Sequence, residues 1–503
     1  MNEGIGKWLT KHCERFPDKE AIIYENIRLT YKQLNNRTNQ LSHALIDLGV
    51  RKGDRVCALL LNTNEFLETM FACAKIGAIF VPINTRISLE EVEYIVRDSS
   101  GHIFMCDRRL INIAERLRER NTPVQYFICT GSSASAMVAY EKLLANFSGE
   151  EPQFELRLDD IHLIMYTSGT TGKPKGAMIT HGNMQWNAIN CLSFLPIEKS
   201  EITYTVAPLF HIGGLNIFTT PVIYKGGTVV LSDKFDPQLT LEMIEKEKAT
   251  STFLVPSMWL AIMQFPRFLE YDIRSLRLNL SGGAPCPITV IEYFQEKGVP
   301  FFEGFGLTET APIVSMLDDQ NSIRKRGSIG KTPLHVEVKI VNSMDMEVPH
   351  GEVGELLVRG PNIFVGYWNN PLETQRAIKN DWFYTGDLAK MDEEGFLYIV
   401  DRKKDMVISG GENIYPIEIE QVLFRMPNVK EVAVVGVPHE KWGESTKAYI
   451  VLSDPMQDIT LADVVKFCDG RLGRFKIPSQ LEILDGLPRN ATGKILKRVL
   501  QKR

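Results

Sequence analysis

The sequence predicts an α/β protein with a large N-terminal domain of parallel and mixed sheets with helices and a small C-terminal α/β domain. From residue 50 onward, short β-branched runs alternate with amphipathic stretches of helical length, a pattern typical of βαβ units in a largely parallel sheet. A chain of 503 residues is too long for one compact core, so at least two domains are expected. Its 44% hydrophobic and 24% charged residues are typical of a folded globular protein.

The elements follow this pattern in order along the chain. Residues 55–61 predict a strand, residues 65–77 a helix and residues 78–82 the next strand. Between about residues 327 and 400 the apolar runs become shorter and turn signals come closer together, as around 336–341 and 354–359. This spacing predicts a small antiparallel, barrel-like part at the end of the N-terminal domain.

The charged segment 401–405 predicts a domain boundary. It lies between a predicted strand at 395–400 and an apolar run that ends in a Ser-Gly-Gly sequence at 409–411. We therefore expect an N-terminal domain over residues 1–400 and a C-terminal lid domain over residues 401–503.

Charge and cysteine usage exclude several classes of protein. A net charge of -5 and an isoelectric point near 6.1 give no basic surface for nucleic acid. The eight cysteines are scattered without a CxxC pair, which predicts reduced thiols in a cytoplasmic protein. No apolar run reaches the 18 or so residues that a membrane span needs, although peripheral association with a membrane stays open.

The strongest local motif is a loop at residues 166–176 that follows an apolar strand at 161–165. Glycines let the backbone approach an anion, hydroxyl groups donate hydrogen bonds and lysines supply positive charge, so the loop predicts a polyphosphate site. It is not a Walker loop, because Pro174 follows Lys173 where that loop has Ser or Thr. The predicted phosphate-binding residues are Thr167, Ser168, Gly169, Thr170, Thr171, Gly172, Lys173 and Lys175.

Six motifs in a fixed order resemble those of the adenylate-forming superfamily of acyl-CoA synthetases, adenylation domains and luciferases. They lie at 166–176, 281–285, 303–310, 384–388, 401–405 with 408–413, and 488–494. The resemblance implies an enzyme that activates a carboxylic acid with ATP and Mg2+ as an acyl-adenylate and then passes the acyl group to coenzyme A (CoA). Homodimers are plausible for such ligases, which leaves a homodimer open here.

The resemblance also assigns nucleotide contacts. Thr308 would hydrogen-bond a phosphate, and Glu309 with Thr170 would hold Mg2+, a cation that prefers oxygen ligands. Asp387 and Arg402 would hold the ribose. The remaining predicted contacts, among them an aromatic residue that would stack on adenine, are Gly283, Ala284, Pro285, Glu303, Gly304, Phe305 and Gly306.

Two half-reactions require a moving lid. Lys494 resembles the lysine that bridges the substrate carboxylate and the α-phosphate, where it would stabilise charge in the transition state. The thiol then needs access to the place of Lys494, so the lid would turn about a pivot at Lys404. The turned lid would present to CoA the residues Ser409, Gly410, Gly411 and Glu412.

The predicted acyl pocket is apolar, which favours a medium- or long-chain fatty acid. A dicarboxylate would need a buried cation and an amino acid a buried carboxylate, and neither occurs in these segments. Three other hypotheses stay open: an aryl or hydroxycinnamate-type acid, a separate carrier protein as acceptor, and a non-enzymatic sensor, which retention of the adenylation lysine disfavours. The predicted pocket residues, including a candidate catalytic histidine, are His211, Ile212, Gly213, Trp259, Gly282 and Ala311.

Overall fold

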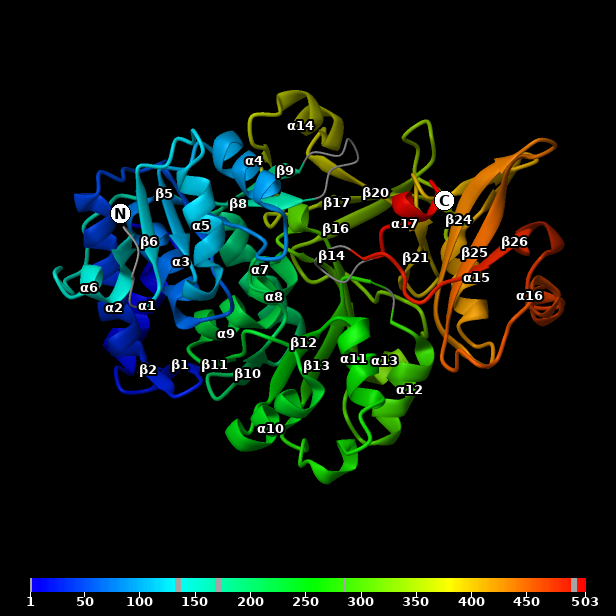
Figure 1. Ribbon diagram of the computed structural model, residues 1–503, viewed down its shortest axis with the longest axis horizontal. Coiled ribbons are helices and arrows are strands. Elements are labelled where there is room, and N and C mark those ends of the chain that lie inside the picture. Colours follow the sequence, from blue (N-terminus) through cyan, green and yellow to red (C-terminus); the bar gives the residue numbers. More distant parts are fainter. Residues whose placement is uncertain (1, 132–136, 168–173, 285, 490–494) are drawn as a thin grey trace.

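Two large sheets form the body of the molecule (Figure 1). The computed structural model describes residues 2–131, 137–167, 174–284, 286–489 and 495–503. The strands of sheet A, in spatial order, are β15 (Ile313–Leu317), β14 (Phe302–Gly306), β13 (Leu278–Gly282), β12 (Ser251–Leu254), β10 (Ile202–Thr205), β11 (Thr228–Leu231), β1 (Glu20–Tyr24) and β2 (Ile27–Thr30). Those of sheet B are β18 (Gly366–Tyr367), β9 (Lys175–Thr180), β8 (Ile161–Thr167), β4 (Ile79–Pro82), β3 (Arg55–Leu59), β5 (Ile103–Cys106), β6 (Tyr126–Cys129) and β7 (Val138–Ala139).

Both sheets are parallel in their interior and antiparallel at one or both edges. In sheet A the antiparallel pairs are β1 with β2 and β14 with β15. In sheet B they are β8 with β9 and β9 with β18. The prediction of a largely parallel α/β body is therefore confirmed, and the strand and helix expected at 55–61 and 65–77 appear as β3 and as α3 (Asn64–Ile76).

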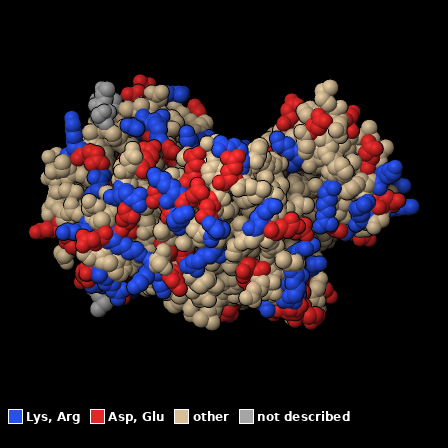
Figure 2. Space-filling view, turned by 90° about the horizontal axis from the view of Figure 1, so that it is seen from below, with Lys and Arg blue, Asp and Glu red and all other residues tan. Residues whose placement is uncertain are grey.

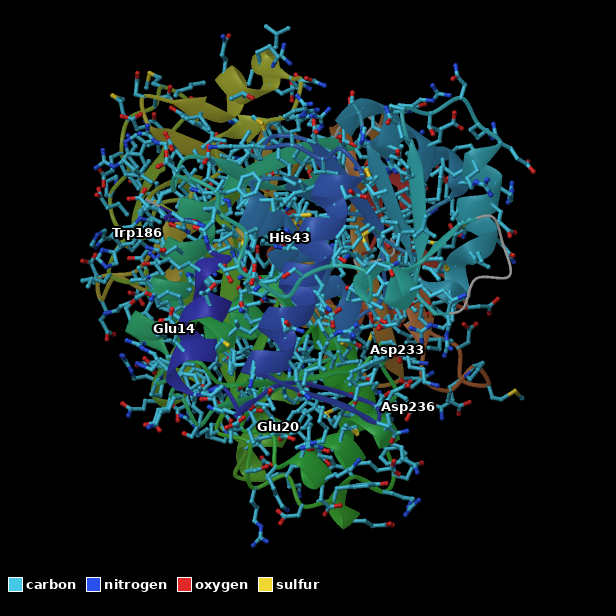
Figure 3. All side chains as sticks on the ribbon, turned by 90° about the vertical axis from the view of Figure 1, so that its left-hand side faces the viewer. Glu14, Glu20, His43, Trp186, Asp233 and Asp236 are labelled. Carbon is cyan, nitrogen blue, oxygen red and sulfur yellow. The ribbon has the colours of Figure 1, made fainter. Side chains whose placement is uncertain are left out.

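A shared layer of helices fills the space between the two sheets. Alternation along β3 shows why: Val56 and Ala58 face this inner core, while Cys57 and Leu59 face an outer one. The inner helices are α1 (Lys7–Arg15), α2 (Tyr31–Asp47), α3, α7 (His181–Phe194), α8 (Ile212–Gly214), the π-helix Leu215–Thr219 and α9 (Thr220–Lys225). Figure 3 looks onto α1 and α2, which carry the labelled Glu14 and His43.

Further helices cover the outer faces, so the body has five layers. Those packed on sheet A are α10 (Pro237–Glu247), α11 (Pro256–Met263) and α12 (Ile288–Glu296), and those packed on sheet B are α4 (Leu89–Ser99) and α5 (Ile111–Arg118). Two further short helices belong to the body, α6 (Tyr140–Leu144) and α13 (Asp319–Ser322). The N-caps follow from the sequence: Asp236, labelled in Figure 3, accepts a hydrogen bond from the backbone of Leu239 at the start of α10.

The antiparallel part predicted near residues 327–400 is confirmed as sheet C. Its strands are β16 (Glu337–Val341), β17 (Gly354–Arg359), β19 (Ile378–Lys379), β20 (Trp382–Met391) and β21 (Leu397–Arg402), with α14 (Pro371–Ala377) between β18 and β19. All pairings within it are antiparallel. The predicted division between residues 400 and 401 falls inside β21, two residues before that strand ends.

The last hundred residues form a smaller lobe with its own sheet, at the right of Figure 1. Sheet D contains β22 (Val407–Ser409), β23 (Glu412–Ile414), β24 (Val429–His439), β25 (Gly443–Leu452) and β26 (Gln480–Ile483). One face packs on α15 (Pro416–Leu423) and α16 (Leu461–Cys468), the other on α17 (Lys497–Leu500). All eight cysteines are free thiols. Across the described part of the chain, no helix combines the length and apolarity that a membrane crossing requires.

Two buried histidines stack between β8 and α7. The ring centroids of His162 and His181 lie 4.8 Å apart, with an angle of 17° between the ring planes. The backbone N–H of Ile5 donates to His181 Nδ1 over 3.2 Å, whereas neither ring nitrogen of His162 has a hydrogen-bond partner among the described residues. Burial lowers the pKa of His162 well below its usual value and that of His181 to about 4.

This pair should make the fold sensitive to acid. An unfolded histidine binds a proton near pH 6.5, but folded His181 does so only near pH 4, so the unfolded state holds more protons between these values. The free energy of unfolding should therefore fall as the pH is lowered through this window, by about 1.4 kcal/mol per pH unit for each histidine. The free energy of unfolding should be measured in urea at pH 6.5, 5.5 and 4.5. In His162→Phe it should depend on pH less steeply than in wild type, by about 1.4 kcal/mol per pH unit.

His43 supplies the matched control for this prediction. It lies on the surface of α2, where its Nε2 contacts the backbone oxygen of Glu150 over 3.0 Å. His43→Gln should keep the wild-type dependence of the unfolding free energy on pH. Equal slopes in wild type and His162→Phe would contradict the assignment.

Candidate active site

The predicted phosphate loop connects β8 to β9. Thr167 and Lys175 are paired across these strands, so the two ends of the loop lie side by side. Six predicted phosphate-binding residues lie outside the described part of the chain: Ser168, Gly169, Thr170, Thr171, Gly172 and Lys173. The ammonium of Lys175 forms an ion pair with Glu373 of α14.

A second predicted segment, from Thr308 to Ala311, follows β14 of sheet A and begins with a 3-10 turn (Thr308–Thr310). The side-chain amide of Asn362 donates to the backbone oxygens of Thr310 and Ile313 over 2.6 and 2.8 Å. Asn216 donates to the backbone oxygen of Ala311 over 2.9 Å. The loop is thus held from both sides by residues distant in sequence.

Glu309 is fixed by the segment that leads into β18. The backbone N–H of Phe364 donates to the Glu309 backbone oxygen over 2.9 Å. The phenol of Tyr367 donates to Glu309 Oε1 over 2.8 Å. A carboxylate is the kind of ligand that Mg2+ takes in combination with nucleotide phosphates, so the predicted metal residue fits that cation chemically.

The predicted ribose residues meet across two strands of sheet C. Asp387 of β20 is paired with Arg402 of β21, and Arg402 Nε lies 3.0 Å from Asp387 Oδ1. The carboxylate of Asp387 is almost fully buried, while the arginine side chain is about one-third exposed. This arrangement holds a charged acceptor and a charged donor next to each other, as recognition of vicinal hydroxyl groups requires.

The predicted adenine wall lies at the carboxyl ends of β13 and β14. Gly283 has a φ of +83° and is exposed together with Ala284, while Pro285 lies outside the described residues. Gly306 admits no side chain, because a Cβ there would lie 1.8 Å from the backbone oxygen of Pro312. The ring of Phe305 is half-buried, packed toward sheet C, and Gly304 lies between it and Glu303 on β14.

Glu303 in this wall has a carboxyl group whose pKa is raised strongly. Burial raises the pKa of its carboxyl to about 8. Its Oε2 and the hydroxyl of neighbouring Ser281 are both buried, and neither has a hydrogen-bond partner within the described residues. At neutral pH the carboxyl is therefore largely protonated and can donate a hydrogen bond.

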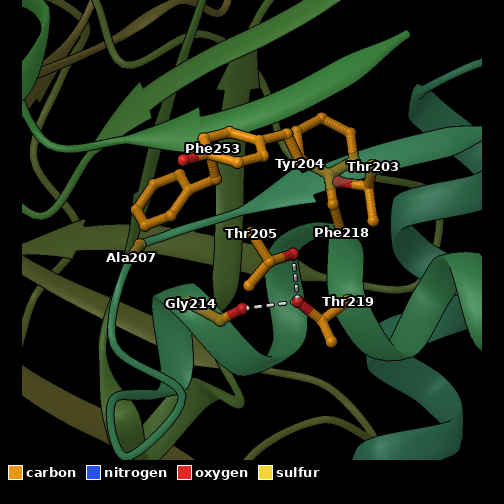
Figure 4. A pocket seen from close by; sticks show the side chains of 8 residues that line it. All are labelled: Thr203, Tyr204, Thr205, Ala207, Gly214, Phe218, Thr219 and Phe253. Carbon is orange, nitrogen blue, oxygen red and sulfur yellow. Dashed lines mark hydrogen bonds between the residues drawn. The ribbon is translucent and has the colours of Figure 1, made fainter. Parts of the chain in front are cut away.

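Two of the predicted acyl residues, Gly213 and Gly282, lie against the ring of Phe253 on β12. A Cβ on Gly213 would lie 3.0 Å from one edge of that ring, and a Cβ on Gly282 would lie 3.2 Å from another. Phe253 also lines a tightly packed part of the interior, shown in Figure 4, that leaves no room for a water molecule. The lining residues are Thr203, Tyr204, Thr205, Ala207, Gly214, Phe218, Thr219 and Phe253.

Two predicted members of the acyl pocket behave differently. His211 precedes α8, and burial lowers the pKa of its ring to about 4, with Arg86 as a smaller cause. Its Nε2 is buried and has no hydrogen-bond partner in the described structure. Trp259, in contrast, packs against Phe294 and Phe301 in the outer core of sheet A, so the structure does not bring it to the other acyl residues.

The predicted CoA residues form the turn between β22 and β23 in the smaller lobe. Ser409 pairs with Glu412 across this turn, and Gly410 and Gly411 both have positive φ. A notch separates this lobe from the body in Figure 2, and basic and acidic side chains are interspersed on the face shown. Lys494 lies outside the described residues.

The connection between body and lobe is anchored next to the predicted pivot. Lys404 is exposed in the turn after β21. Asp401, which is buried, accepts a hydrogen bond from the backbone N–H of Ile417 at the start of α15 over 3.0 Å. Burial raises the pKa of the Asp401 carboxyl to about 6.

Sequence reasoning missed Tyr367, Glu373 and Asp401 as parts of the site. Tyr367 and Glu373 lie 58 and 198 positions from the residues that they contact, so no local spacing could reveal them. Asp401 was noted only as part of a charged segment, and its burial was the missing information.

A mixed α/β body with a small C-terminal lobe, and with motifs at the carboxyl ends of parallel strands, is the architecture of adenylate-forming enzymes. The chain belongs to the family of AMP-binding enzymes: the family model matches residues 9–368, and that of the AMP-binding enzyme C-terminal domain matches residues 418–494. It is an AMP-forming acid–thiol ligase that uses ATP, Mg2+ and CoA.

Several relatives are similar over their whole length. A feruloyl-CoA synthase of Amycolatopsis sp is 38% identical, covering 100% of this chain and 99% of that protein. An indoleacetate–CoA ligase of Aromatoleum aromaticum is 38% identical (98% and 96% covered), and a long-chain-fatty-acid–CoA ligase of Mycobacterium tuberculosis is 35% identical (99% and 98%).

Solved structures of CoA ligases also match this chain over nearly its whole length. An anthranilate CoA ligase in complex with anthranoyl-AMP has a TM-score of 0.94 at 28% identity, covering 100% of this chain and 97% of that one. An o-succinylbenzoate CoA synthetase of Bacillus subtilis with ATP and magnesium has a TM-score of 0.87 at 33% identity, covering 99% of each chain.

The buried carboxyl of Glu303 should make the fold less stable as the pH rises from about 4.5 to about 8. The unfolded carboxyl loses its proton near pH 4.5 and the folded one near pH 8, so the folded state holds the extra proton between these values. The free energy of unfolding should therefore fall as the pH rises through this window, by about 1.4 kcal/mol per pH unit. Glu303→Gln cannot ionise and should gain about 2 kcal/mol over wild type between pH 5.5 and 7.5 in urea unfolding.

The exposed Glu119 at the end of α5 provides the control. Glu119→Gln should follow the wild-type stability at both pH values. A Glu303→Gln variant whose stability relative to wild type is the same at pH 5.5 and 7.5 would show that the carboxyl is ionised throughout.

Proposed function

We propose that the acid activated by this ligase is an aryl or arylalkenoic acid of hydroxycinnamate type. The observation that carries the proposal is an aromatic side chain beside the predicted acyl residues: the ring of Phe253 lies against Gly213 and Gly282, with Phe218 in the same group of residues shown in Figure 4. Aromatic rings pack well against a flat aromatic acid in stacked or edge-to-face geometry. The names of the feruloyl and indoleacetate ligases, both 38% identical, support the same class.

A medium- or long-chain fatty acid is the second candidate. It is supported by the 35% identity to a long-chain-fatty-acid–CoA ligase and by the apolar character of Ile212 and Ala311, both buried. A separate carrier protein as the acyl acceptor is a third candidate, and no contact among the described residues supports it.

The proposed mechanism distributes roles among the residues described above. Thr308 and Lys175 contact phosphates, Glu309 holds the Mg2+ that shields phosphate charge, and Asp387 with Arg402 holds the ribose. His211 is neutral at physiological pH because of its lowered pKa, so it contributes a hydrogen bond rather than a charge near the acyl group.

The lid residues complete this proposal. Lys494 stabilises the transition state of adenylation, the lobe turns about Lys404, and the turn at 409–412 then contacts CoA. A cytoplasmic location and a homodimer remain predictions from the sequence.

A panel of acids tests the substrate class. Pyrophosphate release with ATP, Mg2+ and CoA should be measured for ferulate, cinnamate, indoleacetate, octanoate, palmitate and a dicarboxylate. We expect kcat/KM for the best aryl acid to exceed that of the best fatty acid at least about tenfold, since a matched aromatic contact adds to apolar burial. The reverse order would establish the second candidate, and turnover independent of CoA would favour the carrier protein.

The substitution Phe253→Leu tests whether the ring of Phe253 causes the preference for an aryl acid. Losing one aromatic contact should lower kcat/KM for the aryl acid about three- to tenfold, with a smaller effect on a fatty acid. Phe127→Leu, a half-buried site on β6 in sheet B, should leave both unchanged. A Phe253→Leu variant with equal losses for both acids would remove Phe253 from the acyl pocket.

The lid assignment predicts opposite effects of two substitutions. Lys494→Ala should lower the rate of adenylate formation at least about a hundredfold, because a transition-state contact is lost, while thioester formation from a supplied acyl-adenylate continues. Lys404→Pro should slow thioester formation more than adenylation, because it stiffens the pivot. Single-turnover rates of each half-reaction measure both effects, and equal loss in the two steps would contradict either role.

A further inference from the structure

Tyr367 lies between the predicted phosphate loop and the predicted metal carboxylate. It belongs to β18, the edge strand of sheet B, and pairs with Ala177 of β9 just after that loop. Its phenol reaches across to Glu309 over 2.8 Å. One side chain therefore links a strand of sheet B to a loop of sheet A at the site of the nucleotide.

The direction of this hydrogen bond follows from the chemistry of the two groups. A carboxylate offers only acceptors, whereas a phenol carries an O–H group. The Tyr367 hydroxyl therefore donates the hydrogen bond and Glu309 Oε1 accepts it. A carboxylate held through one oxygen in this way has a fixed orientation and presents its remaining lone pairs in a defined direction.

The ring of Tyr367 is also fixed, independently of its hydroxyl group. It packs edge-on against Phe364, with 4.9 Å between the ring centroids and an angle of 69°. The ammonium of Lys175 lies 5.5 Å from the centroid of the Tyr367 ring and forms an ion pair with Glu373. Removing only the hydroxyl should therefore leave the ring in place.

We infer that Tyr367 is a positioning residue that orients the Glu309 carboxylate for the Mg2+ of the ATP complex. The inference rests on the proposed role of Glu309 as the metal ligand and adds the residue that prepares it. Hydrogen bonds to a metal-binding carboxylate tune metal affinity, and losing such a partner commonly weakens it about 10- to 100-fold.

The test compares Mg2+ dependence in Tyr367→Phe and wild type. Calorimetric titration of the whole protein with ATP at a series of Mg2+ concentrations, and pyrophosphate release at the same concentrations, give the Mg2+ level at half-effect. We expect this level to rise about tenfold in Tyr367→Phe, with activity largely recovered at saturating Mg2+. A purely structural role would lower activity at every Mg2+ concentration.

Tyr140 provides a matched control in the same chain. Tyr140 is the first residue of α6, and its side chain is fully buried. Its phenol donates to the carboxylate of Glu68 on α3 over 2.6 Å. Tyr140→Phe loses the same kind of hydrogen bond in the core of the body. Its Mg2+ dependence should be that of wild type, even if its melting temperature falls.

A third variant separates failure of this inference from failure of the proposed function. If Glu309→Gln abolishes the Mg2+ dependence of ATP binding but Tyr367→Phe does not shift it, the inference is wrong and the metal role of Glu309 stands. If Glu309→Gln leaves the Mg2+ dependence unchanged, or wild type binds no ATP, the metal assignment and the inference fall together. An equal shift in Tyr367→Phe and Tyr140→Phe would also overturn the inference.

Discussion

The structure depends on one packing constraint, the single helix layer buried by both large sheets. Parallel strands need crossover connections, and here the crossovers of sheets A and B share the space between them. The 3-10 turn Thr308–Thr310 that follows β14 of sheet A consequently contacts β9 of sheet B, although more than a hundred residues separate the two. Motifs distant in sequence thereby become neighbours.

Local patterns predicted what depends on local chemistry. The strand at 354–359 was placed to the residue, and the antiparallel character of sheet C followed from the spacing of its turns. The motif order was sufficient for the family. The position of Trp259 could not be predicted in this way, because an apolar helix after a strand can cover either face of a sheet. Helix α11, which carries Trp259, covers the outer face of sheet A.

Contacts across long sequence separations could not be predicted in the same way. Tyr367 has no motif of its own, and its relation to Glu309 exists only once sheets A and B are assembled. The shifted pKa values of His162, Glu303 and His211 likewise arise first from burial, which composition around each residue did not specify. The placement of the Phe253 ring against two glycines, on which the proposed substrate class rests, likewise exists only in the folded chain.

The hydrogen bond from the backbone N–H of Ile417 to buried Asp401 joins α15 of the lobe to β21 of the body. A rotation that separates β21 from α15 must break this bond and expose a carboxylate, which costs free energy before any new contact forms. If the lobe turns as proposed, this hydrogen bond holds it in the orientation described here until other contacts replace it. Substrate contacts would then favour one orientation of the lobe over the other, so that adenylation and thioester formation follow each other in time.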